Sequence, residues 1–452
     1  TIRNGTFFFK RNVGESGMDQ LSLMCRDTDF PPMSLDIYAT PGAKIKVTGT
    51  NPLIYTWRVD SPVKEQQEHN RFIEDSRDLW DEFQRLAIKE RSMRSASEAE
   101  RKALRTKSDS ISSIINQREL KLMKELPISN VWMEKLLRLS MSLKYNSRFT
   151  NKEEILALYD RLNEEQKASI EGQEIRVNLF PPKTVKEGDD MADADLFDLD
   201  GKVHHLADFK GKYMLLDFWS SGCGPCIMAL PEMKEIQEQY KDRLTIISLS
   251  SDTQTRWKAA STQHEMTWQN LSDLKQTAGL YAVYDVNGIP NYVLISPKGK
   301  IVKMWSGYGK GSLKLKMRRY LDAPKREMSI TGDTNRKVVN YPSFESTNTD
   351  ILEVKQVELT DTATIVHFYA YYIPKYWIQV SVNAKLVDEQ GTSYTLQKAD
   401  GITPGKHFFL PESGEAEFSL TFKPLPLKTK SFNFTEGTAK NDWQINGIKL
   451  TR

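Results

Sequence analysis

The sequence has few of the residues on which metal sites and disulfide frameworks depend. It contains three cysteines and six histidines among 452 residues. A structural zinc site normally takes four ligands, and the chain has no second Cys-x-x-Cys pair and no His-x₃₋₅-His pair. His204 and His205 are neighbours on an expected strand and would face opposite ways. We therefore expect no metal site and no cofactor.

Long apolar runs and an excess of one charge are also absent. No run approaches the roughly 18 apolar residues that span a bilayer. Sixty-three basic against 60 acidic residues give a net charge of only +3. The charge balance therefore does not indicate a nucleic-acid partner, and we expect none. The sequence begins at Thr1 without methionine. We expect a processed, exported protein, with membrane attachment through a segment ahead of Thr1 as an alternative.

The most informative motif is Cys223-Gly224-Pro225-Cys226, which follows an apolar run from Tyr213 to Phe218. An apolar stripe at helical spacing comes next, formed by Cys226, Ala229, Leu230, Met233 and Ile236. A cysteine at the start of a helix has its thiolate stabilised by free backbone N–H groups and the helix dipole. The motif therefore indicates a redox-active dithiol, with a half zinc site and a purely structural pair as the alternatives.

These residues resemble thioredoxin. The chain has Asp217 six residues before the first cysteine, Trp219 between them, and Gly288-Ile289-Pro290 followed by an apolar strand. The lead-in from Leu206 to Lys212 is more similar to the TlpA/ResA-like exported thiol-disulfide oxidoreductases. The resemblance covers about residues 185 to 324. Gly222 departs from the family, because a tryptophan commonly precedes the first cysteine there.

The resemblance implies a role for each site residue. Cys223 attacks a substrate disulfide, and Cys226 then resolves the mixed disulfide. Asp217 lies in an apolar strand, so we expect burial to raise its pKa and to suit it to accept the proton of Cys226. Pro290, if cis, would present the backbone of Ile289 to an extended substrate. Trp219, Gly224 and Pro225 are the other expected substrate contacts.

The sequence favours a reductase of protein disulfides in the periplasm or cell envelope. Its expected partners are disulfide-containing client proteins and an upstream thiol that supplies electrons. A disulfide isomerase or oxidase remains an alternative. So does an envelope binding protein with an auxiliary redox module. A thiol peroxidase is a further alternative, although Ser220 stands where supporting residues for a peroxidatic cysteine are expected.

We expect a multidomain α/β plus β protein of four parts. Residues 1–60 form a β domain, 61–180 a helical segment packed on it, 181–324 a thioredoxin fold, and 325–452 an immunoglobulin-like β-sandwich. Strands expected in the first and last parts include Gly5–Lys10, Leu21–Cys25, Ile351–Val354, Ala363–Tyr369, Trp377–Val382 and Glu417–Phe422.

Four local features carry further expectations. Cys25 shares an apolar strand face and should be a buried, inert thiol, with a reactive third cysteine as the alternative. Thr150 and Glu153 should form a capping box at a helix start. The basic run from Lys310 to Arg319 should be the solvated face of a helix, with contact to anionic lipid as the alternative. The aromatic residues from Phe368 to Trp377 should fill the sandwich core and its interface, with sugar or client binding as the alternative.

Overall fold

The structure is a computed structural model that describes residues 7–10, 12–13, 17–25, 27–93, 97–146, 149–322, 327–437 and 442–451. The chain forms two compact units, one of residues 1–184 and 275–285 and one of residues 185–274 and 286–452. The division into four domains stays a prediction. Its boundary at 324/325 falls outside the described residues.

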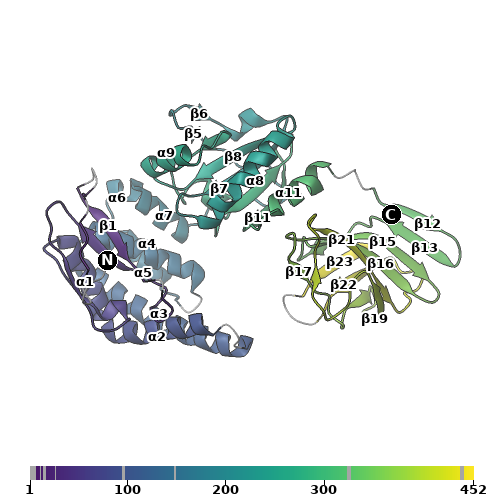
Figure 1. Cartoon of the computed structure of the whole chain (residues 1–452), viewed down its shortest axis with the longest axis horizontal. Helices are drawn as coiled ribbons and strands as arrows, with labels where there is room; N and C mark the ends of the chain where they lie inside the picture. The colour runs from purple at the N-terminus through teal and green to yellow at the C-terminus, as the bar shows by residue number, and fades with distance from the viewer. Residues whose placement is uncertain are drawn as a thin grey trace. The chain divides into compact units, whose positions relative to one another are not determined.

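The first unit combines two small antiparallel hairpins with a set of helices (Figure 1). The hairpins are β1 (Asp19–Leu23) with β2 (Leu35–Ala39), and β3 (Lys46–Thr48) with β4 (Arg58–Asp60); a short 3-10 helix, η1 (Ile54–Thr56), precedes β4. The helices are α1 (Lys64–Asp75), α2 (Arg77–Ser92), α3 (Glu98–Glu125), α4 (Asn130–Tyr145), α5 (Lys152–Tyr159), α6 (Glu164–Ala168), α7 (Ile170–Leu179) and α10 (Leu280–Val283). The expected helical stretch is therefore divided into separate helices, and a buried apolar cluster around Trp132 and Leu136 joins several of them.

Three expectations in this unit are wrong. Residues 7–10 of the strand expected at Gly5–Lys10 are irregular and exposed, and Gly5 and Thr6 lie outside the described residues. β1 ends at Leu23, so Cys25 lies beyond it and is half-buried rather than buried. Helix α5 has Asn151 as its N-cap, without a capping hydrogen bond from that side chain. The amide of Asn151 instead donates to Glu154, which takes the place of the expected box.

The second unit holds a five-stranded sheet in the order β11-β10-β7-β8-β9. Strands β7, β8 and β9 run parallel, and β10 and β11 are antiparallel to their neighbours. These strands are β7 (Tyr213–Trp219), β8 (Leu244–Ser250), β9 (Gln269–Leu271), β10 (Asn291–Ile295) and β11 (Ile301–Ser306). The short elements ahead of β7 are β5 (Leu196–Phe197), β6 (Val203–His204) and the 3-10 helix η2 (Leu206–Phe209). This arrangement confirms the expected thioredoxin fold.

Helix α8 (Gly224–Tyr240) connects β7 to its parallel neighbour β8, and α9 (Gln254–Gln263) connects β8 to β9. The apolar stripe predicted for α8 is buried throughout and packs on side chains of the sheet such as Leu215, Ile246 and Leu294. Figure 1 shows α8 lying along this sheet. Because helices and loops cover β7 as the middle strand, six of its seven residues are buried. The redox motif therefore follows directly on a strand in the buried interior of the sheet.

The C-terminal region is a sheet of ten antiparallel strands in the order β12-β13-β15-β16-β21-β19-β18-β22-β23-β14. They are β12 (Ser329–Gly332), β13 (Arg336–Asn340), β14 (Ser346–Thr347), β15 (Leu352–Thr360), β16 (Thr364–Tyr371), β18 (Lys385–Asp388), β19 (Ser393–Asp400), β21 (Glu415–Phe422), β22 (Ser431–Thr435) and β23 (Gln444–Lys449). A separate ribbon pairs β17 (Trp377–Ile378) with β20 (Phe408–Phe409). The immunoglobulin-like assignment stays a prediction.

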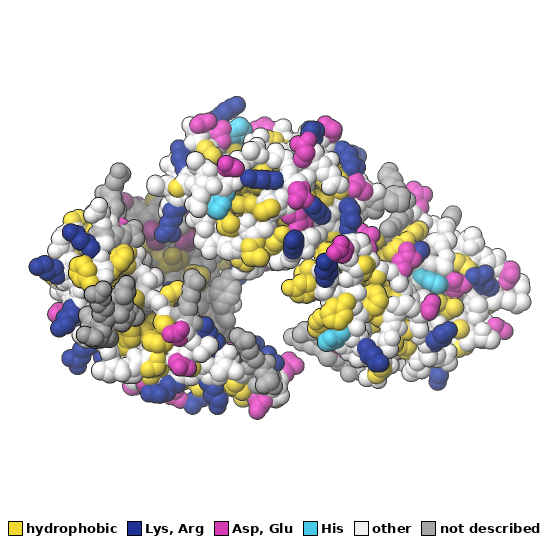
Figure 2. All heavy atoms as spheres, viewed as in Figure 1, with side chains coloured by type: hydrophobic (Ala, Val, Ile, Leu, Met, Phe, Trp, Pro, Cys, Tyr) yellow, Lys and Arg dark blue, Asp and Glu magenta, His cyan; other side chains and the backbone are white. Residues whose placement is uncertain are grey.

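The aromatic residues expected to fill the core divide into two groups. Phe368 is fully buried between Phe418 and Phe434. Trp377 is 46% exposed and its ring stacks on His407, with centroids 3.8 Å apart. Figure 2 shows hydrophobic side chains gathered on the surface where β17 lies. The prediction of core packing is therefore wrong for the β17 residue.

The basic run from Lys310 to Arg319 is a solvated face only in part. It includes α11 (Ser312–Met317) and the first residues of η3 (Arg318–Asp322). Lys310 is exposed, and Lys314 pairs with Glu235 of α8. Lys316 lies 2.9 Å from the carboxylate of Asp350, and the Arg319 guanidinium stacks on Tyr371 at 4.4 Å. These two contacts join the parts of the second unit and correct the solvated interpretation for Lys316 and Arg319, whereas the lipid-facing alternative stays a prediction.

Candidate redox site

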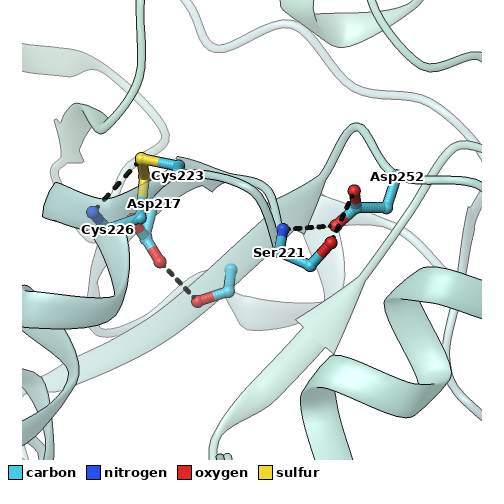
Figure 3. The surroundings of a disulfide bond; sticks show 6 residues. Asp217, Ser221, Cys223, Cys226 and Asp252 are labelled. Atoms are coloured by element: carbon cyan, nitrogen blue, oxygen red, sulfur yellow. Dashed lines mark hydrogen bonds between the residues drawn. A yellow bond between two sulfur atoms is a disulfide. The ribbon is translucent and has the colours of Figure 1, made fainter. Parts of the chain in front are cut away.

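The two cysteines of the motif form a disulfide at the start of α8 (Figure 3). Their Cα atoms are 5.3 Å apart. Cys223 is the N-cap of α8, and its sulfur accepts a hydrogen bond from the backbone N–H of Cys226 at 3.2 Å. Pro225 occupies the first turn, where its missing N–H costs nothing. The helix start therefore directs backbone donors at the first sulfur, which stabilises a thiolate there once the bond is reduced.

The two sulfurs differ in accessibility in the expected direction. Cys223 is 8% exposed and Cys226 is 2% exposed. Gly222, Gly224 and Pro225 around them are exposed, so the loop side of the disulfide faces solvent. Cys223 is therefore the more exposed cysteine of the pair, and its place as the first thiol to meet a substrate stays a prediction.

Asp217 lies beside the disulfide in the middle of β7 (Figure 3). The side chain is 2% exposed, and burial raises its pKa from 3.8 to about 7. One hydrogen bond opposes this effect: the hydroxyl of Ser248 donates to Asp217 Oδ2 at 2.7 Å. A carboxyl group that titrates near neutral pH is suited to exchange a proton with a thiol.

The loop before β10 completes the site. The peptide bond between Ile289 and Pro290 is cis, as the role given to Pro290 required. Ile289 is half-buried and packs against the apolar cluster that contains both cysteines. The loop thus borders the dithiol, and Pro290 itself is buried.

Trp219 is placed differently from the prediction. Its side chain is fully buried and packs with both cysteines, Trp257 and Ala260 in one apolar cluster. A buried ring has no surface for a substrate, so the expected substrate contact is wrong for this residue. Trp219 instead supports the disulfide from the protein interior.

Two polar residues near the dithiol were not predicted from the sequence. Asp252 binds Ser221, which lies two residues ahead of Cys223 (Figure 3). Ser248 stands directly opposite Asp217 on the parallel strand β8. The sequence does contain a sign of the role of Ser248. It is a serine inside a buried, otherwise apolar strand, and such a hydroxyl needs a hydrogen-bond partner.

His204 and His205 do not form a shared metal site. His204 pairs with Asp198 at 2.8 Å, and His205 pairs with Asp195 at 2.9 Å. Within the described residues no group of three or more potential metal ligands comes together. The described helices also include none with the length and apolar character needed to cross a bilayer.

Comparisons with known proteins agree on the central part of the chain. The AhpC/TSA family model matches residues 188–304. The thioredoxin-like protein YneN of Bacillus subtilis is 31% identical over 121 residues, which cover 26% of this chain and 69% of YneN. The thiol-disulfide oxidoreductase ResA of Geobacillus thermodenitrificans is 32% identical over 139 residues, which cover 30% of this chain and 79% of ResA.

Solved structures also match the chain. A thiol:disulfide interchange protein from Bacteroides sp. has a TM-score of 0.29 at 28% identity, covering 31% of this chain and 93% of that one. The thioredoxin domain of a thiol-disulfide oxidoreductase from Bacteroides vulgatus has a TM-score of 0.26 at 30% identity. The match covers 28% of this chain and 91% of that domain.

Proposed function

Because this chain belongs to the TlpA/ResA-like family of thioredoxin-fold thiol-disulfide oxidoreductases, we propose that it reduces disulfides of client proteins in the cell envelope. The observation that carries this proposal is the Cys223–Cys226 disulfide at the start of α8 with the buried Asp217 beside it. The Gly-Pro dipeptide between the cysteines resembles that of reducing thioredoxins. The envelope setting is taken from the exported proteins that the motif resembles.

The reaction begins with the reduced dithiol. The Cys223 thiolate attacks one sulfur of a substrate disulfide, so a bond forms between Cys223 and that sulfur while the other substrate sulfur leaves as a thiolate. The exposed loop around Cys223 leaves room for this approach. The resulting mixed disulfide holds enzyme and substrate together.

The second step resolves the mixed disulfide. Cys226 passes its proton to the carboxylate of Asp217 and attacks the sulfur of Cys223 as a thiolate. The Cys223–Cys226 disulfide forms, and the second substrate sulfur leaves as a thiolate. Two electrons have then moved from the enzyme to the substrate. An external thiol donor must reduce the enzyme again before the next cycle.

Backbone pairing at the Ile289–Pro290 loop is the proposed way of holding the substrate. The loop borders the dithiol, and an extended peptide beside Ile289 would be placed with its sulfur near Cys223. Gly224 and Pro225 are exposed between the two cysteines, in accord with a substrate-facing role.

Variants of the two cysteines and a measured potential test the proposal. Cys223→Ser should abolish reduction of insulin disulfides, whereas Cys226→Ser should accumulate mixed disulfides with clients. We expect the reduction potential of the dithiol to be about −270 mV, as in reducing thioredoxins. A value near about −120 mV, which is typical of strong oxidants, would overturn the reductase direction but not the family.

The cellular setting needs its own test. A membrane-impermeant thiol reagent added to intact cells after reduction should label Cys223 of the full protein if the dithiol lies outside the cytoplasmic membrane. Cys223→Ser is the matched control for that labelling. Labelling only after the cells are broken would place the protein in the cytoplasm.

A further inference from the structure

Asp217 is the first member of a chain of buried hydrogen bonds that leads away from the dithiol. The hydroxyl of Ser248 donates to Asp217 Oδ2 at 2.7 Å. The indole N–H of Trp268 donates to the same Ser248 oxygen at 2.8 Å. Ser248 is fully buried and Trp268 is 7% exposed. The three side chains come from β7, from β8 and from the residue just ahead of β9, so the sheet itself brings them together.

The direction of these hydrogen bonds follows from the chemistry of the groups. An indole N–H can only donate, so it occupies an acceptor position of the Ser248 oxygen. The single proton of the hydroxyl is then directed at the carboxyl group of Asp217. A hydrogen bond donated to a carboxylate stabilises its charged form. Burial instead favours the neutral, protonated form. The pKa of Asp217 therefore depends on both burial and the hydrogen bond from Ser248.

We propose that Ser248, oriented by Trp268, is a positioning residue for the redox reaction, whose hydroxyl holds the buried carboxyl group of Asp217 by a hydrogen bond that favours its charged form. This inference rests on the proposed role of Asp217 as the proton acceptor for Cys226. Neither Ser248 nor Trp268 touches the substrate, so both act through Asp217.

The other groups that face Asp217 fit this assignment. Tyr292 lies directly opposite it on the antiparallel strand β10. Burial, together with the negative charge of Asp217, raises the pKa of Tyr292, so its phenol stays neutral. From α8, the cysteines adjoin Asp217 (Figure 3). Ser248 donates a hydrogen bond to the carboxylate, and the pKa of about 7 results from burial with that bond opposing it.

The experiment follows the titration of Asp217 in the full, reduced protein by NMR of aspartate labelled with carbon-13 at the carboxyl carbon. Asp217→Asn identifies the signal by its loss. In Ser248→Ala the midpoint should move up by roughly one pH unit, because a charge-assisted hydrogen bond is lost. Trp268→Phe replaces the indole with a smaller aromatic ring that has no N–H, and should move the midpoint in the same direction by less.

Ser261→Ala is the matched control. Ser261 is also a buried serine, and its hydroxyl bonds to the backbone of Trp257 rather than to Asp217. An unchanged Asp217 midpoint in folded Ser248→Ala, or an equal shift in Ser261→Ala, would overturn the inference. If Ser248→Ala does not fold, Trp268→Phe tests the inference in its place. An unchanged Asp217 midpoint in Trp268→Phe would then overturn the inference.

Stopped-flow kinetics of mixed-disulfide resolution separate this inference from the proposed function. The pH at which resolution is half-maximal should rise in Ser248→Ala together with the Asp217 midpoint, and the rate at pH about 7 should fall roughly fivefold. In the Asp217→Asn background, adding Ser248→Ala should leave the pH profile unchanged. If Ser248→Ala shifts the Asp217 titration midpoint but leaves the pH profile of resolution unchanged, the hydrogen-bonding role of Ser248 is supported. The same result would overturn the role of Asp217 as proton acceptor.

Discussion

The carboxylate of Asp252 binds Ser221 through two hydrogen bonds. The backbone N–H of Ser221 donates to Oδ2 at 2.6 Å, and its hydroxyl donates to Oδ1 at 3.0 Å. Asp252 is itself fixed, since its backbone N–H donates to Ser250 at 3.1 Å. Because Ser221 lies two residues before Cys223, this carboxylate anchors the loop from which the nucleophile projects.

Loss of this anchor should loosen the loop. In Asp252→Asn the negative charge is lost, so the hydrogen bonds between this side chain and Ser221 are no longer charge-assisted and become weaker. We expect a decrease of about 1–2 kcal/mol in the free energy of unfolding and faster exchange of the Ser221 amide proton. Urea unfolding and hydrogen exchange measure these effects. Asp190→Asn is the control, because Asp190 is an exposed partner of Lys300; equal effects in both variants would show that Asp252 has no special role.

Stability should depend on pH through Asp217. Its pKa is about 7 in the folded protein against 3.8 for the free side chain, so the folded state holds the proton more tightly. The contribution of Asp217 to stability is therefore complete below about pH 4 and is lost as the pH rises through about 7. Asp217→Asn stays uncharged and should gain stability over the wild type at about pH 8, on the order of 3 kcal/mol. Urea unfolding of the oxidised proteins tests this, and parallel pH curves for the two proteins would contradict it.

Gly222 should accept a large side chain. A Cβ atom built there meets no atom within 4 Å, and the residue is exposed. Gly222→Trp should therefore change the free energy of unfolding by less than about 1 kcal/mol. We expect the ring to add an apolar platform beside Cys223 and to lower KM for protein disulfides more than it changes kcat. Gly222→Ala is the control without a platform. A marked loss of stability in Gly222→Trp would show that the open space is not available.

Asp350 should contribute to the contact between α11 and the C-terminal sheet region. Its carboxylate lies 3.4 Å from Lys303 and 2.9 Å from Lys316. Burial opposes the charge, but the two lysines lower the pKa of Asp350 overall. Its stabilising effect is therefore present above about pH 4 and is lost as the pH falls through the depressed pKa. Asp350→Asn should lower the free energy of unfolding by about 1 kcal/mol at neutral pH and by less in acid.

Thermal unfolding of the full chain at two pH values measures this difference. Glu412→Gln is the matched control, because it removes an exposed partner of Lys375 in the same region. A loss of stability in Glu412→Gln as large as in Asp350→Asn would contradict a specific role for Asp350.

The redox site could be predicted because its determinants are local. The apolar strand, the helix stripe and the Cys-Gly-Pro-Cys turn between them fix the two sulfurs within a few residues. The burial of Trp219 could not be predicted in the same way. Strand β7 is covered on both faces, so the alternation that normally separates an inner from an outer face is missing. Ser248 lies on β8 and Asp252 two residues beyond its end, and the parallel pairing of β7 with β8 brings both to the site.

The other predictions that the structure corrects also failed because they depend on tertiary contacts. The charged residues of α11 and η3 have the pattern of a solvated helix, and nothing local indicates that Lys316 and Arg319 meet the C-terminal sheet region. Cys25 has the parity of a buried strand residue, but the pairing of β1 with β2 ends at Leu23. A period of two predicts a face only as far as the strand continues.

The assignment of residues 275–285 to the first compact unit has a consequence for cutting the chain. The backbone passes between the units three times, so a single nick near residue 184 gives two polypeptides that share one folding unit. The second polypeptide carries the buried side chains of Leu280 and Tyr284 and the N–H of Thr277 that donates to Glu174 of the first. The nicked halves should therefore co-purify as a fragment complex until denaturant is added.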